Sequence, residues 1–427
     1  MLEYGGNMKK GLTLTMVMLL SVALLFAGGT AETSTETGPE TIVWAGWSGE
    51  EEASRDIFNS MRTRYEEESG NKVDWVGWTW ADTAQQILIR LQGGEQLDIA
   101  QADIGIFNTI AQTGALADLN DILGKEYLEN TFEKSYLDVG NIDGKQLGLP
   151  WSMASISMVY NPQILKEAGW DESPKTLDEF EKCLADIKAL DKDIIPYGVS
   201  TKDATAAGDL MPWLWTFGTS VFNEDGSVNL GSEAVEAIKW YQDMLAKGYI
   251  AMDIGRGDAR QLFAQGRMAF YDDAVVAKGQ AVNNGVDPDK VVEVCSAMPR
   301  PVLQSGDPSQ STMWGHLLVI FDSSKHKEVA ADFAKSLLSD DLALEYFKKN
   351  GMPPVTKSAA STDTVQNDPY LKGFMESTAT ARLDETARMS NAGEIKTIMT
   401  EELQSALLGQ KSAEQAVESM RTRISAL

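Results

Sequence analysis

The amino-acid sequence predicts an α/β protein that is divided into two lobes. The chain has 427 residues, which is more than one hydrophobic core usually serves. Strand and helix patterns alternate along its first part. Residues 141–170 then join a tight turn, an extended apolar segment and a helix start without interruption. We therefore expect two packed bodies, with the chain crossing from one to the other in this stretch.

The first part of the chain repeats a strand–helix pattern. The expected strands are residues 41–45, 72–76 and 97–102, and the expected helices are residues 51–68, 83–91 and 104–112. In the first of these helices Ile57, Phe58, Met61 and Tyr65 fall on one face, which is the spacing of an amphipathic helix. A βαβαβ succession of this kind predicts a mainly parallel sheet with helices on both faces.

The crossing stretch is defined by its turn and its proline. A turn at residues 143–144 precedes a short expected strand at 146–149. Pro150 has no amide proton to donate to a strand ladder, and it keeps Leu149 extended. The strand pattern resumes at residues 156–160, and an Asn-Pro pair directly afterwards opens a helix.

The remainder of the chain continues the α/β pattern. The expected helices are residues 177–190, 232–247 and 258–265, the expected strands are residues 268–271, 291–297 and 317–321, and a tryptophan-rich junction lies at 212–217. The only two cysteines fall within these elements. Cys183 is on the apolar face of the helix 177–190, and Cys295 is in the strand 291–297. We expect both to be buried free thiols rather than partners in a disulfide.

Several motifs occur in the order and spacing of one large family. The crossing stretch contains GKQLGLPW followed by MVYNPQILKEAGW. The other motifs are GGE at 93–95, LDI at 97–99, AQTGAL at 111–116 and FAQGRMA at 263–269. Together they resemble the extracellular solute-binding proteins of ABC importers, a family that includes the maltose- and oligosaccharide-binding proteins.

The resemblance implies a two-lobe periplasmic binding protein fold that is type II-like, with a ligand cleft between the lobes. Carried over to this sequence, lobe one comprises residues 41–149 and 298–337, and lobe two comprises residues 150–297 and 338–427. Each lobe is expected to contain a mainly parallel sheet with helices on both faces.

The N-terminus has the features of a signal peptide. A basic start at residues 8–10 precedes an apolar run at 12–27, and small residues follow. We expect residues 1–31 to be the signal peptide and 32–40 a polar tether, so that the protein is periplasmic or extracellular. The alternative of a membrane anchor is disfavoured because the run is shorter than the roughly 20 residues that span a bilayer. Gly29 stands where a lipoprotein has its acylated cysteine, so we expect no lipid anchor.

The composition excludes several classes of protein. A formal net charge of −26 disfavours nucleic acids and anionic membrane surfaces as partners. The chain has only two histidines and lacks HExxH, CxxC and Walker patterns, so zinc hydrolysis, acyl transfer by histidine and nucleotide hydrolysis lack their parts. We expect no catalytic residues, no metal and no cofactor. A secreted glycoside hydrolase needs only two carboxylates, so it remains the rival hypothesis.

The eleven tryptophans indicate a binding function because several of them follow strands. In open α/β sheets the ligand crevice lies beyond the carboxyl ends of the strands. Aromatic faces there suit the C–H face of a pyranose, and nearby polar side chains bind its hydroxyls. We expect Trp44, inside a strand, and Trp170 and Trp240, on helices, to pack in the cores instead.

The resemblance also implies a set of ligand-binding residues when the contacts of the family are carried over. They are Trp47, Ser48, Trp78, Trp80, Asp103, Trp151, Ser152, Trp213, Trp215, Asp272, Trp314 and Gly315. Asp103 has an equal alternative role as the cap of the helix that follows it. Ala154 stands where maltose-binding relatives have a carboxylate, which argues against maltose as the ligand.

The function implied by the resemblance is that of a monomeric receptor outside the cytoplasm. It would capture a neutral mono- or oligosaccharide between its lobes and deliver it to the membrane permease subunits of an ABC importer, without catalysis. A glycerol-phosphate receptor and a polyamine receptor are the alternatives within the family. The first would need a cation in the cleft, for which Arg256, Arg260 and Arg300 are the candidates, and the second would need several carboxylates.

Overall fold

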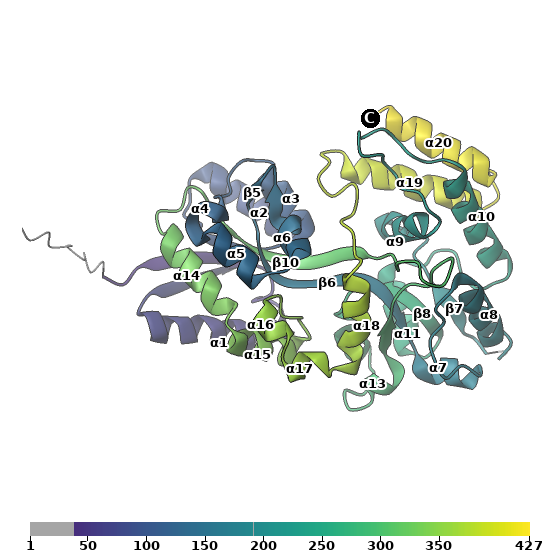
Figure 1. Ribbon diagram of the computed structural model, residues 1–427, viewed down its shortest axis with the longest axis horizontal. Coiled ribbons are helices and arrows are strands. Elements are labelled where there is room, and N and C mark those ends of the chain that lie inside the picture. The colour runs from purple at the N-terminus through teal and green to yellow at the C-terminus, as the bar shows by residue number, and fades with distance from the viewer. Residues whose placement is uncertain (1–37, 191) are drawn as a thin grey trace, which may run out of the picture. The chain divides into compact units, whose positions relative to one another are not determined.

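A mixed β-sheet forms the centre of the computed structural model, which describes residues 38–190 and 192–427 (Figure 1). The strand order is β2-β1-β3-β10-β6-β8-β7, with β9 paired to β6 and a separate β4–β5 hairpin. The strands are β1 Thr41–Gly46, β2 Lys72–Gly77, β3 Ile99–Asp103, β4 Asn141–Ile142, β5 Lys145–Gln146, β6 Leu149–Tyr160, β7 Ile195–Gly198, β8 Met268–Asp273, β9 Ser296–Met298 and β10 Thr312–Ile320. The expected signal peptide and most of the tether, residues 1–37, lie outside the described ranges.

Helices flank this sheet along the whole described chain. In the first part they are α1 Glu52–Ser69, α2 Trp80–Gly93, α3 Ile104–Ala111, α4 Leu119–Leu123, α5 Lys125–Thr131, α6 Lys134–Gly140, α7 Pro162–Glu167, α8 Leu177–Lys188, α9 Ala204–Thr216 and α10 Ser232–Ala246. In the second part they are α11 Arg256–Ala264, α12 Ala277–Asn283, α13 Val291–Val294, α14 Lys327–Leu337, α15 Asp340–Asn350, α16 Lys357–Ala360, α17 Asp363–Gln366, α18 Pro369–Thr378, α19 Ala392–Leu407 and α20 Ala413–Ser425.

The sheet contains both parallel and antiparallel strand pairs. β1 pairs in parallel with β2 and β3, and β7 pairs in parallel with β8. β10 is antiparallel to both β3 and β6, while β6 is antiparallel to β8 and β9. β6 leads the chain away from β3 and β10 brings it back, so these two strands run in opposite directions. The predicted two-lobe α/β fold is confirmed, but the sheet is mixed rather than mainly parallel.

The crossing stretch forms one long strand instead of the two short ones expected. The first part of β6 pairs with β10, and its last residues, from Ser157 to Tyr160, pair with β8. The register with β10 shifts opposite Trp151, where Leu317 pairs with Pro150 and His316 pairs with Ser152. This irregularity accommodates the proline, which has no amide proton for the ladder.

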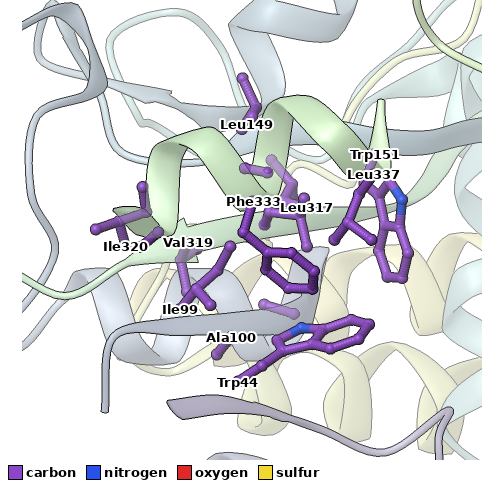
Figure 2. Close-up of a cluster of buried hydrophobic side chains, with 14 of the residues drawn as sticks. Trp44, Ile99, Ala100, Leu149, Trp151, Leu317, Val319, Ile320, Phe333 and Leu337 are labelled. Carbon is purple, nitrogen blue, oxygen red and sulfur yellow. The ribbon is translucent and has the colours of Figure 1, made fainter. Parts of the chain in front are cut away.

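The first core is the hydrophobic cluster that covers β1, β3, β10 and the start of β6. Trp44 is fully buried there, as expected, and its ring stacks on Phe58 at 4.9 Å between centroids. Phe333 of α14 meets the same indole edge-on at 5.1 Å, and Figure 2 shows the two rings together with Trp151. The assignment of residues to lobes stays a prediction; this core continues past residue 337 as far as Val355.

Two further hydrophobic clusters cover the remainder of the sheet. The second core includes Phe270 of β8, and a third cluster includes the next residue, Tyr271, which points to the opposite face because strand side chains alternate. Cys183 lies in the second core and Cys295 in the third cluster. Both are buried free thiols, as predicted, and burial raises the pKa of each to about 12.

The expected strand at residues 291–297 is wrong in its first part. Residues Val291–Val294 form the short helix α13, and only Ser296–Met298 form a strand. Val291 is buried in the third cluster while Val292 is 52% exposed. Packing on one side of a single helical turn therefore outweighs the strand propensity of a valine-rich segment.

Candidate ligand-binding site

A cavity of about 690 Å³ lies where side chains from the first and second cores meet. One wall comes from the starts of α2 and α3, the floor comes from β6 and β10, and the other wall comes from residues 384–396, which we call the cleft segment. Met389 of the cleft segment packs against the second core, and Ile104 of α3 packs against the first core. The cavity is thus built from both halves of the chain.

Strand register explains why the predicted residues reach this cavity. β1, β2 and β3 are parallel, so their carboxyl ends lie at one edge of the sheet. Asp103 is the last residue of β3 and pairs with His316 of the antiparallel β10. Trp314 precedes His316 by two residues and therefore lies just beyond the end of β3. Four predicted ligand-binding residues line the cavity, namely Trp80, Asp103, Trp314 and Gly315.

The carboxylate of Asp103 caps α3 with one oxygen and binds Trp80 with the other. Its Oδ1 accepts a hydrogen bond from the backbone amide of Ile106 at 2.7 Å, which caps α3. Its Oδ2 accepts a hydrogen bond from Trp80 Nε1 at 2.6 Å. Trp80 is 56% exposed, a high value for a tryptophan, so its ring stands at the mouth of the cavity. The cap is confirmed, and ligand binding by Asp103 stays a prediction.

A network of buried side chains packs against Trp314. The ring centroid of His316 lies 4.8 Å from that of Trp314 and 5.0 Å from that of Trp47. Gln101 Nε2 lies 3.3 Å from His316 Nδ1 and donates to Ser48 Oγ at 2.8 Å. Burial lowers the pKa of His316 to about 3, so its imidazole is neutral at physiological pH.

Gly315 is required by the close approach of two strands. A Cβ at this position would lie 2.2 Å from Met153 Sδ and 2.7 Å from the carbonyl oxygen of Ser152 on β6. Both contacts are far shorter than van der Waals separation. The glycine therefore lets β10 pack against β6 beside Trp314, and any side chain here would displace the floor of the cavity.

The network residues Trp47 and Ser48 lie outside the cavity lining, and ligand binding by them stays a prediction. Trp47 is 4% exposed, and Ser48 is 1% exposed. The backbone amide of Ser48 donates to Gln101 Oε1, so the serine holds Gln101 beneath His316. Trp78 is half-buried, lies outside the cavity and has the guanidinium of Arg90 5.4 Å from its ring.

Two crossover residues belong to the interior and not to the cavity. Trp151 is buried in the first core and stacks on Tyr346 at 5.3 Å between centroids. Ser152 is fully buried, and its hydroxyl donates to the carbonyl oxygen of Pro353 at 3.2 Å. They lie where β6 is covered by α15 and the segment after it, and ligand binding by them stays a prediction.

The three predicted residues of the second lobe are also buried. Trp213 is fully buried and has the guanidinium of Arg300 4.7 Å from its ring. Trp215 is 5% exposed, and its Nε1 donates to Glu385. Asp272 forms an ion pair with Arg300 in which both side chains are inaccessible to solvent. Buried aromatic and charged groups of this kind need internal partners, which these three residues have, and ligand binding by them stays a prediction.

The arginines considered for a phosphate ligand already have carboxylate partners. Arg300 pairs with Asp272, as described above, and Arg256 pairs with Asp209, whose side chain is 1% exposed. Arg260 makes two hydrogen bonds of 2.7 Å to Asp273. None of these arginines lines the cavity. The cation that does is Lys396, which forms an ion pair of 2.5 Å with Asp384.

Sequence reasoning missed the whole cleft segment. Its side chains line the cavity opposite α3, and they include Asp384, Met389, Ser390 and Lys396. The segment runs into the start of α19, and just before it the backbone amide of Met313 on β10 donates to the carbonyl of Arg382 at 2.7 Å. A polar run between two helices offered no periodic signal, and its only cue was an unusually high density of charged and hydroxyl side chains.

The part of the chain that the structure describes contains neither a membrane-spanning helix nor a cluster of metal ligands. Within residues 38–190 and 192–427, no helix has both the length and the apolar character needed to cross a membrane. The same residues contain no group of three or more His, Cys, Asp or Glu side chains placed to hold a metal ion.

Comparisons with known proteins assign the class. The family model described as bacterial extracellular solute-binding protein matches residues 60–373. The chain therefore belongs to the family of bacterial extracellular solute-binding proteins. This assignment agrees with the two-lobe fold and with a cavity lined from both cores.

Individual relatives are distant but match along most of their length. The maltodextrin-binding protein MdxE of Bacillus subtilis (strain 168) is 21% identical over 91% of both chains. The sn-glycerol-3-phosphate-binding periplasmic protein UgpB of Brucella abortus (strain 2308) is 23% identical over 95% of this chain and 96% of its own. Among solved structures, a cyclic α-maltosyl-1,6-maltose binding protein from Arthrobacter globiformis has a TM-score of 0.78 at 22% identity, over 91% of this chain and 99% of that one.

Proposed function

We propose that this protein is the sugar receptor of an ABC importer. It captures a neutral mono- or oligosaccharide in the cavity between its lobes and delivers it to membrane permease subunits. The observation that carries the proposal is the pairing of aromatic rings with hydrogen-bonding groups in one cavity. Trp314 and Trp80 offer ring faces to the C–H face of a sugar, and the carboxylate of Asp103 lines the same cavity.

The polar lining of the cavity suits hydroxyl groups. The hydroxyl oxygen of Thr312 is buried at the floor and has no hydrogen-bond partner among the described residues. Buried polar atoms normally find a partner, so a ligand that reached this hydroxyl would satisfy it. Lys396 is held by Asp384, which leaves the lining without an unpaired cation. A neutral ligand that both donates and accepts hydrogen bonds fits this arrangement best.

The alternative ligands fit less well. A phosphate would have to separate Lys396 from Asp384, because the arginines of the second lobe are paired elsewhere. A polyamine would need several unpaired carboxylates, whereas Asp103 binds Ile106 and Trp80, and Asp384 binds Lys396. The same engagement disfavours a glycoside hydrolase, which needs a carboxyl group that carries a proton to the leaving group.

The proposal extends to the location and assembly of the protein. Residues 1–31 would direct export as a cleaved signal peptide, and the mature protein would be a monomer without a lipid anchor. Support for export comes from the basic start, the apolar run and the small residues that follow it. Gly29 at the position of the lipoprotein cysteine supports release in soluble form.

A thermal-shift screen over mono- and oligosaccharides tests the sugar proposal. A sugar present at about 100 times its dissociation constant should raise the free energy of unfolding by roughly 2.7 kcal/mol. For a chain of this size that corresponds to a midpoint rise of roughly 3 °C. Glycerol 3-phosphate and spermidine serve as the competing ligand classes. A shift with either of these and with no sugar would refute the proposal, as would recovery of shortened sugars after incubation with the purified protein.

A further inference from the structure

An arginine of the cleft segment makes a direct contact between the two halves of the protein. Arg388 lies after Asp384 and before α19, in the wall that packs on the second core. Its Nη2 donates hydrogen bonds to the carbonyl oxygens of Asp138 and Asn141, both at 2.9 Å. Asp138 is in the last turn of α6, and Asn141 is the residue that follows this helix.

The acceptors of Arg388 are suited to a cation. The last carbonyl groups of a helix lack partners within the helix, and the helix dipole places partial negative charge there. The end of α6 is fixed to the first core, because Leu137 and Val139 are buried in it and Ile142 packs against it. The guanidinium of Arg388 therefore meets a rigid, negatively polarised group of atoms on the first lobe.

The other end of this contact is equally well anchored. Glu385, three residues before Arg388, accepts hydrogen bonds from Trp215 Nε1 and from the backbone amide of Phe222. Met389, the next residue, packs against the second core. The backbone around Arg388 is thus fixed to the second core on both sides.

We propose that Arg388 is a clasp that holds the two walls of the cavity together. It is a positioning residue, because it lines no part of the cavity and acts by keeping the cleft segment close to the first core, against which α3 also packs. Its contact does not involve a ligand, so it shifts the balance between separated and joined walls in the empty protein too. Any effect on ligand affinity rests on the proposed function, whereas the effect on the empty protein does not.

The deciding experiment measures the empty protein by small-angle X-ray scattering. The variants are Arg388→Ala and Arg388→Lys, with Arg421→Ala as the matched control, since Arg421 is an exposed arginine of α20 whose ion-pair partner Glu418 lies on the same helix. An exposed cation at a helix C-terminus contributes up to about 1 kcal/mol, so Arg388→Ala should raise the ratio of open to closed molecules about fivefold. Its radius of gyration should exceed that of the wild type, with Arg388→Lys in between and Arg421→Ala unchanged.

Salt provides a readout that a loss of stability would not produce. Raising NaCl from 0.05 M to 0.5 M should enlarge the wild type, because salt screens an exposed guanidinium, and should leave Arg388→Ala unchanged. For a sugar that binds the closed form, apparent affinity should fall by the same factor as the closed population. Equal radii for the wild type and Arg388→Ala in low salt, or an equal increase in Arg421→Ala, would overturn the clasp. A failure of every sugar to bind would refute the proposed function and leave the scattering result standing.

Discussion

Replacing Asp103 by asparagine and by alanine separates its structural role from its binding role. Its two oxygens have different partners, the amide of Ile106 at 2.7 Å and the indole of Trp80 at 2.6 Å. Asparagine retains a capping oxygen and ranks with aspartate as a helix cap, while alanine removes the cap at a cost of typically about 1 kcal/mol. The free energy of unfolding should therefore fall by about 1–2 kcal/mol in Asp103→Ala and stay nearly unchanged in Asp103→Asn.

Ligand affinity should follow a different order from stability. Hydrogen bonds to a charged group contribute about 1.5–3 kcal/mol, which corresponds to roughly 10–150-fold in the dissociation constant. Asp103→Asn removes the charge and one acceptor, so it should weaken sugar binding within this range although the fold is intact. Asp103→Ala should weaken binding at least as much, because it also loses the start of α3 as a fixed wall.

Urea unfolding followed by circular dichroism measures the first quantity, and isothermal titration calorimetry with the sugar from the thermal screen measures the second. Trp80→Phe is the control, since it removes the indole donor to Asp103 and keeps an aromatic ring at the mouth of the cavity. If Asp103→Asn binds sugar as tightly as the wild type, Asp103 only caps α3, and the assignment of its carboxylate to the ligand is refuted.

Two further predictions concern buried groups. Asp272→Ala should destabilise the protein by about 3–5 kcal/mol, because it leaves the inaccessible Arg300 without its carboxylate partner. The sugar affinity of the folded fraction in calorimetry should stay normal, and a weakened affinity would instead support Asp272 as a ligand contact. His316 has its pKa lowered from 6.5 to about 3 by burial, so only the unfolded state binds a proton between these values. The contribution of His316 to the free energy of unfolding should be fully present above pH 6.5 and should fall by about 1.4 kcal/mol per pH unit below it. In urea titrations at several pH values, His316→Gln should show a smaller change of this free energy with pH. An unchanged dependence on pH would contradict the prediction.

The parts of the fold that were predicted correctly are those with local signals. The turn at residues 143–144 and Pro150 marked the crossing, and the helix face that includes Ile57 and Tyr65 is buried in the first core as expected. The end of β6 and the start of β9 depended on partners distant in sequence. For residues 291–294, local strand propensity gave the wrong element because packing on the third cluster decided the outcome.

The tryptophans show why the site could be located but not fully defined. Trp47 and Trp314 both lie close to strand ends, yet the first is behind His316 and the second faces the cavity. Local sequence reports the end of a strand, whereas the face that meets solvent depends on which helix covers it. Trp151 and Trp213 lie outside the cavity lining for that reason, since Tyr346 and Arg300 cover their rings.

The pairing of charged side chains in the cavity favours a neutral ligand. A protein with a net charge of −26 would repel an anionic ligand at long range, and an anion-binding cavity would have to compensate with unpaired cations. The cation in the lining is Lys396, and its partner Asp384 is fixed by hydrogen bonds from Thr386 of 2.7 and 2.8 Å. A phosphate would therefore have to displace a carboxylate that is itself held in place. A sugar hydroxyl can instead donate to Asp384 or Asp103 and leave the ion pair intact, so its binding requires no separation of charges.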